Sequence, residues 1–111
     1  MGSLLQADDE YLTHKPATTL DKVNFLYDND QEMVAIINCE SGFRQYTVSG
    51  TPLISPTSDV GIMQINQVHW KRAESLGLDI FHSINDNLIM GYIIYSEQGK
   101  NAWTCHLYGD T

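Results

Sequence analysis

The sequence predicts a small, mainly α-helical domain with one long loop. The chain has 111 residues, of which 42% are hydrophobic and 18% charged, which suits one compact globular domain and is too short for two. Two segments, 30–41 and 83–98, combine apolar residues with helix-capping signals. Between them runs a segment dense in Gly, Pro, Ser and Thr. These features favour helices around one core, with a loop long enough to have a function.

The first part of the chain divides into a tail and a short helix. Residues 1–16 are polar and irregular, so we expect a tail or linker that precedes a domain spanning 17–111. The first helix is indicated by four apolar residues: Leu20, Val23, Phe25 and Leu26.

The second helix has clear start and stop signals. Asn29 or Asp30 can cap its N-terminus, and Glu32 stands three residues after Asn29, as in a capping box. Gly42 is a common kind of helix stop, so we expect this helix to run to about Ser41.

The loop over residues 47–61 is expected to include a short hairpin around Gly50. An approach turn and a helix follow, ending near Gly77. In that helix His69 and Trp70 are expected to form the start and pack its face.

The last helix is expected over 84–98. Ser83 and Asp86 can form a capping box at its start, and Gly99 stops it. The remaining segment is irregular, and Trp103 within it is expected to fill the core rather than shape a cleft.

The charge of the chain argues against a polyanionic partner. Fourteen acidic and six basic residues give a net charge of −8, and the basic residues are scattered, whereas nucleic acid binding needs clustered Lys and Arg. No apolar run is long enough for a membrane span, and the N-terminus does not read as a signal peptide. The four histidines have no metal-ligand spacing, so we expect neither a metal nor another cofactor.

Two cysteines, Cys39 and Cys105, are open to two interpretations. They are either two buried thiols or one disulfide that closes a long loop. Such a bond would contribute on the order of 4 kcal/mol in the chain-entropy model and needs an oxidising compartment.

Glu40 occupies an unusual position for a residue that can carry a charge. It lies on the helix face that also carries Met33, Ile36 and Ile37, where an ionised carboxylate is costly. It also lies at the C-terminal end of its helix, where the helix dipole disfavours negative charge. Both effects favour the protonated form that a general acid requires, whereas the ordinary alternative is a carboxylate that turns to solvent.

Three stretches in this order resemble one known family. "CESGFRQY", "SPTSDVGIMQIN" and "DNLIMGYIIY" are similar to the soluble lytic transglycosylase domain of the lysozyme-like superfamily, which is related to goose-type lysozymes. The resemblance covers roughly residues 20–105. It implies a small lysozyme-like helical domain with a long loop or short β-hairpin beside the active-site cleft.

The resemblance implies that Glu40 is the catalytic acid/base. Ser55 would hydrogen-bond the sugar, Gly61 would let the backbone approach the glycan, Met63 would pack beneath the cleft, and Gln64 would bond the sugar near Glu40. The candidate substrate-binding residues are Ser41, Ser55, Asp59, Gly61, Met63, Gln64, Asn66, Asn87, Tyr92 and Tyr95.

The sequence departs from the family pattern at two places. Ser58 and Asp59 replace a usual Gly-Ala, and "GKNAWTCHLYG" replaces a segment whose Tyr lies near the catalytic Glu. The role of that Tyr could pass to Tyr92, Tyr95 or Tyr108, and no motif assigns it. Asp59 is either a solvated loop residue or a group that orients a water molecule.

The resemblance implies a peptidoglycan lytic transglycosylase that cleaves the β-1,4 bond between N-acetylmuramic acid and N-acetylglucosamine with a single Glu. One alternative is a hydrolytic lysozyme in which Asp59 positions water, and another is an inactive glycan-binding module. We expect a monomer that acts on glycan strands outside the cytoplasm, in the periplasm, the cell wall or the medium.

Overall fold

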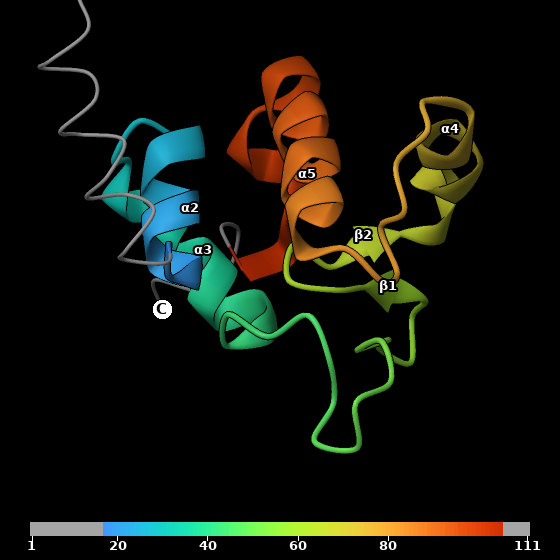
Figure 1. The fold of residues 1–111 in the computed structure, drawn as a ribbon. Coiled ribbons are helices and arrows are strands. Elements are labelled where there is room, and N and C mark those ends of the chain that lie inside the picture. The colour runs from blue at the N-terminus through green and yellow to red at the C-terminus, as the bar shows by residue number, and fades with distance from the viewer. Residues whose placement is uncertain (1–16, 106–111) are drawn as a thin grey trace, which may run out of the picture.

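A computed structural model describes residues 17–105 of the chain. The expected tail, residues 1–16, and Tyr108 lie outside the described residues. Most of the described residues are helical, which confirms the mainly α-helical class (Figure 1). The elements are α2 (Thr19–Leu26), α3 (Gln31–Ser41), β1 (Asp59–Val60), β2 (Ile65–Asn66), η1 (Gln67–His69), α4 (Trp70–Ser75), α5 (Ile84–Gln98) and η2 (Lys100–Ala102), where η marks a 3-10 turn.

Helix α3 begins and ends at local signals. The Asp30 side chain accepts hydrogen bonds from the backbone N–H groups of Glu32 and Met33, at 3.0 and 3.3 Å. Asn29 has a φ of +58°, which is left-handed rather than extended, so the capping box that would start at Asn29 is wrong. At the other end Gly42 has a φ of +64°, and its N–H group donates to a carbonyl of the last helical turn. The helix therefore stops right after the segment that carries Glu40.

Helix α5 keeps one half of its predicted capping box. The Ser83 hydroxyl accepts from the Asp86 N–H at 3.1 Å, as expected. The Asp86 carboxylate instead accepts from the N–H of Asp79 at 2.9 Å. Asp86 thereby fixes the loop that precedes the helix, and Gly99 ends the helix as predicted.

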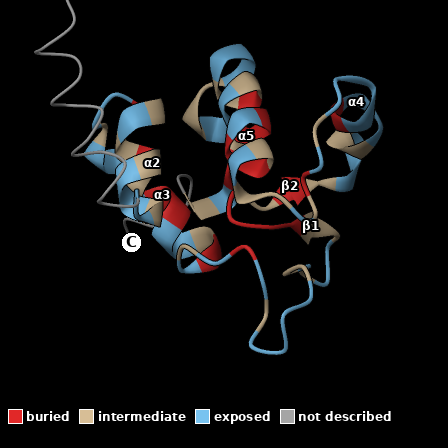
Figure 2. Ribbon diagram, viewed as in Figure 1, coloured by how far each residue is buried: buried red, intermediate tan, exposed pale blue. Residues whose placement is uncertain are grey.

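Helix α5 is the central element of the domain. It contacts α2 on one side and β2 and η2 on others, so it stands between the helical pair α2–α3 and the hairpin (Figure 1). The buried residues gather where these elements face one another (Figure 2). One close approach is at Gly91, where an added Cβ would lie 2.6 Å from the Met63 side chain. This packing places the C-terminal end of α3 opposite the β1–β2 hairpin.

The chain turns back on itself around Gly50, as expected, but its two named strands form a second hairpin further along. β1 pairs antiparallel with β2, with Asp59 opposite Asn66 and Val60 opposite Ile65. Around Gly50 the chain makes a turn closed by an isolated bridge between Tyr46 and Pro52, with no named strand. The long loop therefore ends, rather than begins, with the sheet.

Asn87 has a role different from the expected contact with substrate. Its side chain is 0% exposed. Its amide nitrogen donates to the carbonyls of Val60 and Ile80, both at 2.9 Å, and its amide oxygen accepts from the Met63 N–H at 2.8 Å. The side chain thus satisfies backbone groups of the β1–β2 hairpin and of the loop before α5, which is the usual requirement for a buried polar residue.

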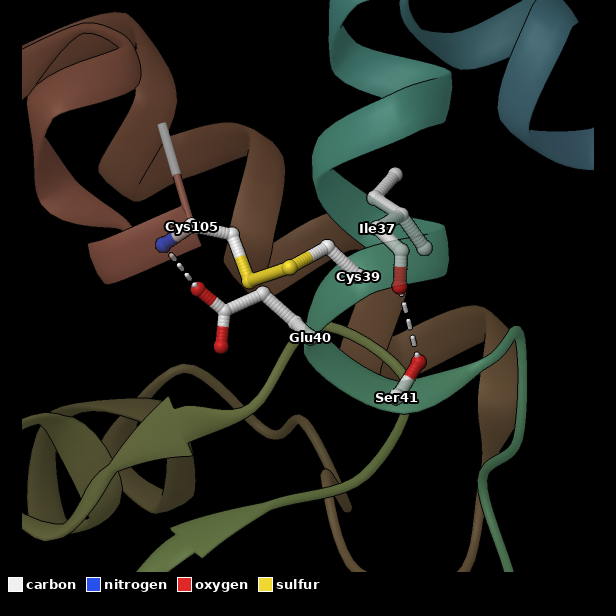
Figure 3. Close-up of a disulfide and its surroundings, with 5 residues drawn as sticks. All are labelled: Ile37, Cys39, Glu40, Ser41 and Cys105. Atoms are coloured by element: carbon white, nitrogen blue, oxygen red, sulfur yellow. Dashed lines mark hydrogen bonds between the residues drawn. A yellow bond between two sulfur atoms is a disulfide. The ribbon is translucent and has the colours of Figure 1, made fainter. Parts of the chain in front are cut away.

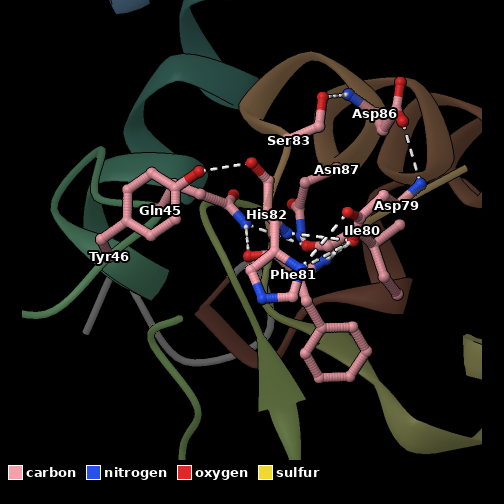
Figure 4. A network of polar contacts seen from close by, with 9 residues as sticks. All are labelled: Gln45, Tyr46, Asp79, Ile80, Phe81, His82, Ser83, Asp86 and Asn87. Atoms are coloured by element: carbon pink, nitrogen blue, oxygen red, sulfur yellow. Dashed lines mark hydrogen bonds and ion pairs between the residues drawn. The ribbon is translucent and has the colours of Figure 1, made fainter. Parts of the chain in front are cut away.

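The side-chain amide of Gln45 also bonds backbone groups of the hairpin and of the loop before α5. Its amide nitrogen donates to the carbonyls of Ile80 and Phe81, and its oxygen accepts from the Ile62 N–H at 3.0 Å. Figure 4 shows both amides meeting the segment 79–82, where Tyr46 also donates to the His82 carbonyl. Two side-chain amides therefore replace the backbone pairing that a longer sheet would provide.

Candidate active site

A small cavity lies between the end of α3, the β1–β2 hairpin and the segment after η2. Its volume is about 80 Å³, room for a few water molecules, so a sugar would reach its groups from the mouth. Its polar side chains are Glu40, Asp59, Gln64, Asn66, His69 and Thr104. The apolar part of the wall is made by Ile65, Ile94, Ala102 and Trp103.

Glu40 is half-buried in this cavity. Burial raises the pKa of its carboxyl, and the negative charge of Asp59 raises it further, against a hydrogen bond that lowers it. That bond comes from the backbone N–H of Cys105 to Glu40 Oε2, at 3.0 Å (Figure 3). The net shift favours the protonated carboxyl, as a general acid requires.

Asp59 has the opposite shift. Burial would raise the pKa of this carboxyl, but hydrogen bonds from Thr57, Asn66 and Ser55 outweigh burial and lower the pKa. The Ser55 hydroxyl donates to Asp59 Oδ2 at 2.7 Å, and Asn66 Nδ2 donates to Oδ1 at 2.9 Å. Two carboxyl groups with pKa values pushed apart therefore share one cavity, which is the pattern of an acid and an ionised partner.

A larger hollow of about 600 Å³ lies between α4 and residues 77–81. Its carboxylates, Glu74 and Asp79, are exposed. A backbone hydrogen bond from His82 is the main reason that the pKa of Asp79 is lowered. Asp79 is therefore held ionised, and the smaller cavity, which contains the half-buried Glu40, is the candidate active site.

Ser55 and Ser41 make local hydrogen bonds. Besides donating to Asp59, the Ser55 hydroxyl accepts from the Asp59 and Thr57 N–H groups, so it supports Asp59 and does not line the cavity. Ser41 is 5% exposed and donates to the Ile37 carbonyl at 3.2 Å (Figure 3). Ser41 therefore bonds the last turn of its own helix.

Gly61 makes a close approach, but to core amides rather than to a glycan. It is buried with a φ of +77°, and an added Cβ would lie 2.2 Å from Asn87 Nδ2 and 2.6 Å from Gln45 Oε1. Met63 is fully buried, and its carbonyl accepts from the indole N–H of Trp103 at 2.7 Å. Met63 thus lies under a residue that forms the cavity wall.

Gln64 and Asn66 do line the cavity. Gln64 has a φ of +49°, and its side-chain nitrogen donates to the Gly61 carbonyl at 2.9 Å. Asn66 caps η1 through the Val68 N–H while its nitrogen holds Asp59. The Gln64 side chain is therefore fixed by the tight turn that joins β1 to β2, and the Asn66 side chain by its bonds to Asp59 and to η1.

Tyr92 and Tyr95 are not part of the cavity. Both pack edge-on against Tyr27, each with ring centroids 5.6 Å from it. Tyr27 is buried, and its hydroxyl donates to the Leu88 carbonyl at 3.3 Å. These tyrosines join α2 to α5, and the structure places neither beside Glu40.

Sequence reasoning missed His69, Thr104 and the N–H of Cys105. α4 begins at Trp70, while His69 faces the cavity. Trp103 is 4% exposed and serves both the core and the wall. The Cys105 N–H is a backbone group, so its contact with Glu40 could not be predicted from the type of the residue.

The structure joins Cys39 and Cys105 by a disulfide, with Cα atoms 6.1 Å apart and a sequence separation of 66 (Figure 3). This distance is ordinary for a disulfide. The bond fixes the last segment of the described chain next to Glu40.

Comparison with known proteins identifies the family. The model of the family described as "Transglycosylase SLT domain" matches residues 26–94. No curated protein and no solved structure matches the chain. The matched segment contains Glu40, Asp59 and the hairpin, and it ends before the wall formed by residues 102–104. Because the match covers more than half of the sequence, the chain belongs to the transglycosylase SLT domain family.

Proposed function

We propose that this protein is a peptidoglycan lytic transglycosylase in which Glu40 is the acid and the base. Membership of the family supports action on peptidoglycan. The observation that carries the assignment of Glu40 is its raised pKa inside a cavity that the matched segment helps to build. The substrate bond is the β-1,4 link between N-acetylmuramic acid and N-acetylglucosamine.

The reaction uses the carboxyl of Glu40 twice. Protonated Glu40 first donates its proton to the glycosidic oxygen as the bond to the anomeric carbon breaks, through an oxocarbenium-like state. Ionised Glu40 then takes the proton of the 6-hydroxyl of the muramic acid residue while that oxygen bonds to the anomeric carbon. Glu40 regains its proton, a 1,6-anhydro end forms, and no water is consumed.

Asp59 contributes through its charge in this proposal. It is held ionised by three hydrogen bonds, and it lies in the cavity with Glu40. Burial does most to keep Glu40 protonated before the reaction, and the negative charge of Asp59 adds to it and favours the positive charge that develops on the sugar.

Product analysis tests the proposal. Purified peptidoglycan digested with the protein should give fragments with 1,6-anhydro ends, which mass spectrometry separates from reducing ends by the mass of one water molecule. Reducing ends as the main product would contradict the proposal. Intact glycan strands would indicate a binding module.

A hydrolytic lysozyme is the second candidate, because an ionised Asp59 shares the cavity with Glu40. Asp59 would then orient a water molecule toward the anomeric carbon. Its carboxylate already accepts hydrogen bonds from Ser55, Thr57 and Asn66, so a water molecule would have to share these oxygens. For that reason we rank hydrolysis second.

The Asp59→Asn variant distinguishes the two candidates. The Asn oxygen can take the place of Oδ2 and keep the hydrogen bonds from Ser55 and Thr57, so the bond from Asn66 is the one lost and the loop should keep its fold. Removing the charge should lower the pKa of Glu40, so the loss of activity at alkaline pH should begin at a lower pH. The rate should fall modestly, with anhydro products unchanged.

The measurement is a pH profile of peptidoglycan lysis with product analysis at each pH. Asp28→Asn is the matched control, because it removes the same charge from an exposed turn at the far end of α3. If the alkaline limit of activity shifts in both variants, the effect comes from the net charge of the protein. If reducing ends disappear only in Asp59→Asn, Asp59 positions water.

We also propose that the protein acts outside the cytoplasm. Its substrate lies there, and the Cys39–Cys105 disulfide needs an oxidising compartment. None of the described helices is long and apolar enough to cross a bilayer.

A further inference from the structure

We propose that the Cys39–Cys105 disulfide makes Cys105 a positioning residue for Glu40, so that proton transfer at Glu40 depends on an intact disulfide. The inference rests on the proposed role of Glu40 as acid and base. It concerns the backbone N–H of Cys105 and the covalent bond that keeps this N–H in place.

A covalent bond and a hydrogen bond join the same two short segments of the chain. Cys39 is the neighbour of Glu40 in α3, and its sulfur is bonded to the sulfur of Cys105. The N–H of Cys105 donates to Glu40 Oε2 at 3.0 Å. Figure 3 shows the disulfide and the hydrogen bond side by side, with the second carboxyl oxygen turned away from both. That second oxygen is therefore the one available to hold the proton that goes to substrate.

The N–H acts on the ionised form of Glu40. A hydrogen bond donor stabilises a carboxylate more than a carboxylic acid, so this N–H favours the state that Glu40 reaches once its proton has left. Burial and the charge of Asp59 favour the other state. The hydrogen bond thus favours the ionised carboxylate, while burial and Asp59 favour the protonated carboxyl. A group that acts first as acid and then as base needs both forms to be accessible.

Few other charged groups face Glu40. In the cavity the described titratable side chains besides Glu40 are Asp59, from β1, and His69, from η1. α5 contributes Ile94, η2 contributes Ala102, and the segment after η2 contributes Trp103 and Thr104, none of which titrates. Among the described residues, Cys105 is the one that donates a hydrogen bond to Glu40.

The segment 100–105 is fixed to α3 at both ends. Lys100 Nζ lies 2.8 Å from an Asp30 carboxylate oxygen and 2.6 Å from a Glu32 oxygen, at the start of α3. Cys105 is bonded to Cys39, near the end of α3. Between them Trp103 is anchored in the core, so breaking the disulfide should release Cys105 and leave the rest of the wall in place.

We expect the disulfide to be reducible, because Cys39 is exposed and Cys105 is half-buried. A dithiol such as dithiothreitol supplies two electrons and two protons, which convert the bond into two thiols while the dithiol becomes a cyclic disulfide. Once Cys105 is free, Glu40 loses its hydrogen bond. We therefore expect the pKa of Glu40 to rise and its side chain to be less well oriented.

The first experiment measures peptidoglycan lysis against pH for oxidised and reduced protein. Reduction should lower the maximal rate on the order of tenfold or more, since small displacements of a catalytic group are costly. The pH at which activity is lost on the alkaline side should move upward. A general loosening of the fold would instead expose Glu40, so the rate would fall while that pH stayed the same or moved downward.

The matched control is the double variant Cys39→Ser with Cys105→Ser. It should behave like reduced protein and should not respond to dithiothreitol. Circular dichroism of both forms checks that the fold is kept. Equal rates and equal alkaline limits for oxidised and reduced protein would overturn the inference.

A second measurement uses the oxidised protein alone, without any assay of activity. In NMR spectra the Cys105 amide proton should change with pH at the same midpoint as the Glu40 carboxyl carbon, and the variant Glu40→Gln should abolish that change. An amide that does not follow Glu40 would overturn the inference. If the amide follows Glu40 but the protein leaves peptidoglycan intact, the proposed function fails while the contact stands.

Discussion

Replacing Glu40 with Gln should abolish peptidoglycan lysis while the domain stays folded. The amide keeps the shape of the side chain, and its oxygen can still accept from the Cys105 N–H, but it has no proton to transfer. We expect the rate to fall by more than the ~10²–10⁴ that general acid–base catalysis contributes alone, because the same group serves in both steps. Turbidity loss of a peptidoglycan suspension measures the effect.

The stability of the same variant gives an independent check. The pKa of Glu40 is raised in the folded protein, so the folded state binds this proton more tightly than the unfolded state. The resulting stabilisation is present below the unfolded pKa and is lost as pH rises through the folded pKa. The amide introduced by Glu40→Gln cannot ionise, so at neutral pH the variant should unfold at the same or a higher temperature than the wild type.

A matched control is Glu74→Gln, which changes an exposed residue of α4. It should leave both lysis and the unfolding temperature close to those of the wild type. If Glu40→Gln keeps a tenth of the wild-type rate, Glu40 is not the acid.

Replacing Gly61 with Ala should destabilise the domain strongly. A methyl group there would lie 2.2 Å from Asn87 Nδ2, and the backbone φ of +77° is unfavourable for Ala. The left-handed conformation costs about 1–2 kcal/mol and overpacking about 1–3 kcal/mol, so we expect a loss of roughly 3 kcal/mol or more in the free energy of unfolding. Urea denaturation followed by circular dichroism measures this loss.

Gly77 provides the matched control. It has the same φ of +77°, but nothing lies within 4 Å of an added Cβ. Gly77→Ala should therefore cost only the conformational part, about 1–2 kcal/mol. Equal losses in the two variants would show that the Asn87 and Gln45 amides yield to the methyl group and are not rigid.

The helices were predictable because their signals are local. Ser83 and Gly99 bound α5, and Gly42 ends α3, as their sequence positions indicated. The half-burial of Glu40 was also predictable, since a carboxylate on an apolar helix face points to burial without any knowledge of the fold. The error at Asn29 is local too, because a left-handed φ cannot be read from the residue type alone.

Contacts between distant segments were not predictable. Asn87 resembles a cleft residue in sequence, yet its partners Val60 and Met63 lie 27 and 24 positions away and are backbone groups. Tyr92 and Tyr95 offered rings for the site, but the rotation of α5 turns them toward Tyr27. The periodicity of apolar residues predicts a helix, but it does not predict which neighbouring element each face of the helix contacts.

The attachment of segment 100–105 at both ends has a consequence for engineering. The family match ends at residue 94, so this wall is supplied by a separate stretch of chain from the one that carries Glu40 and Asp59. With Lys100, Trp103 and Cys105 kept as anchors, positions 102 and 104 are the other residues of this segment that line the cavity. Exchanging these side chains would reshape the mouth of the cavity without touching either carboxylate. Under the proposed function, we expect substitutions at these positions to change the selectivity for glycan substituents while the chemistry at Glu40 is kept.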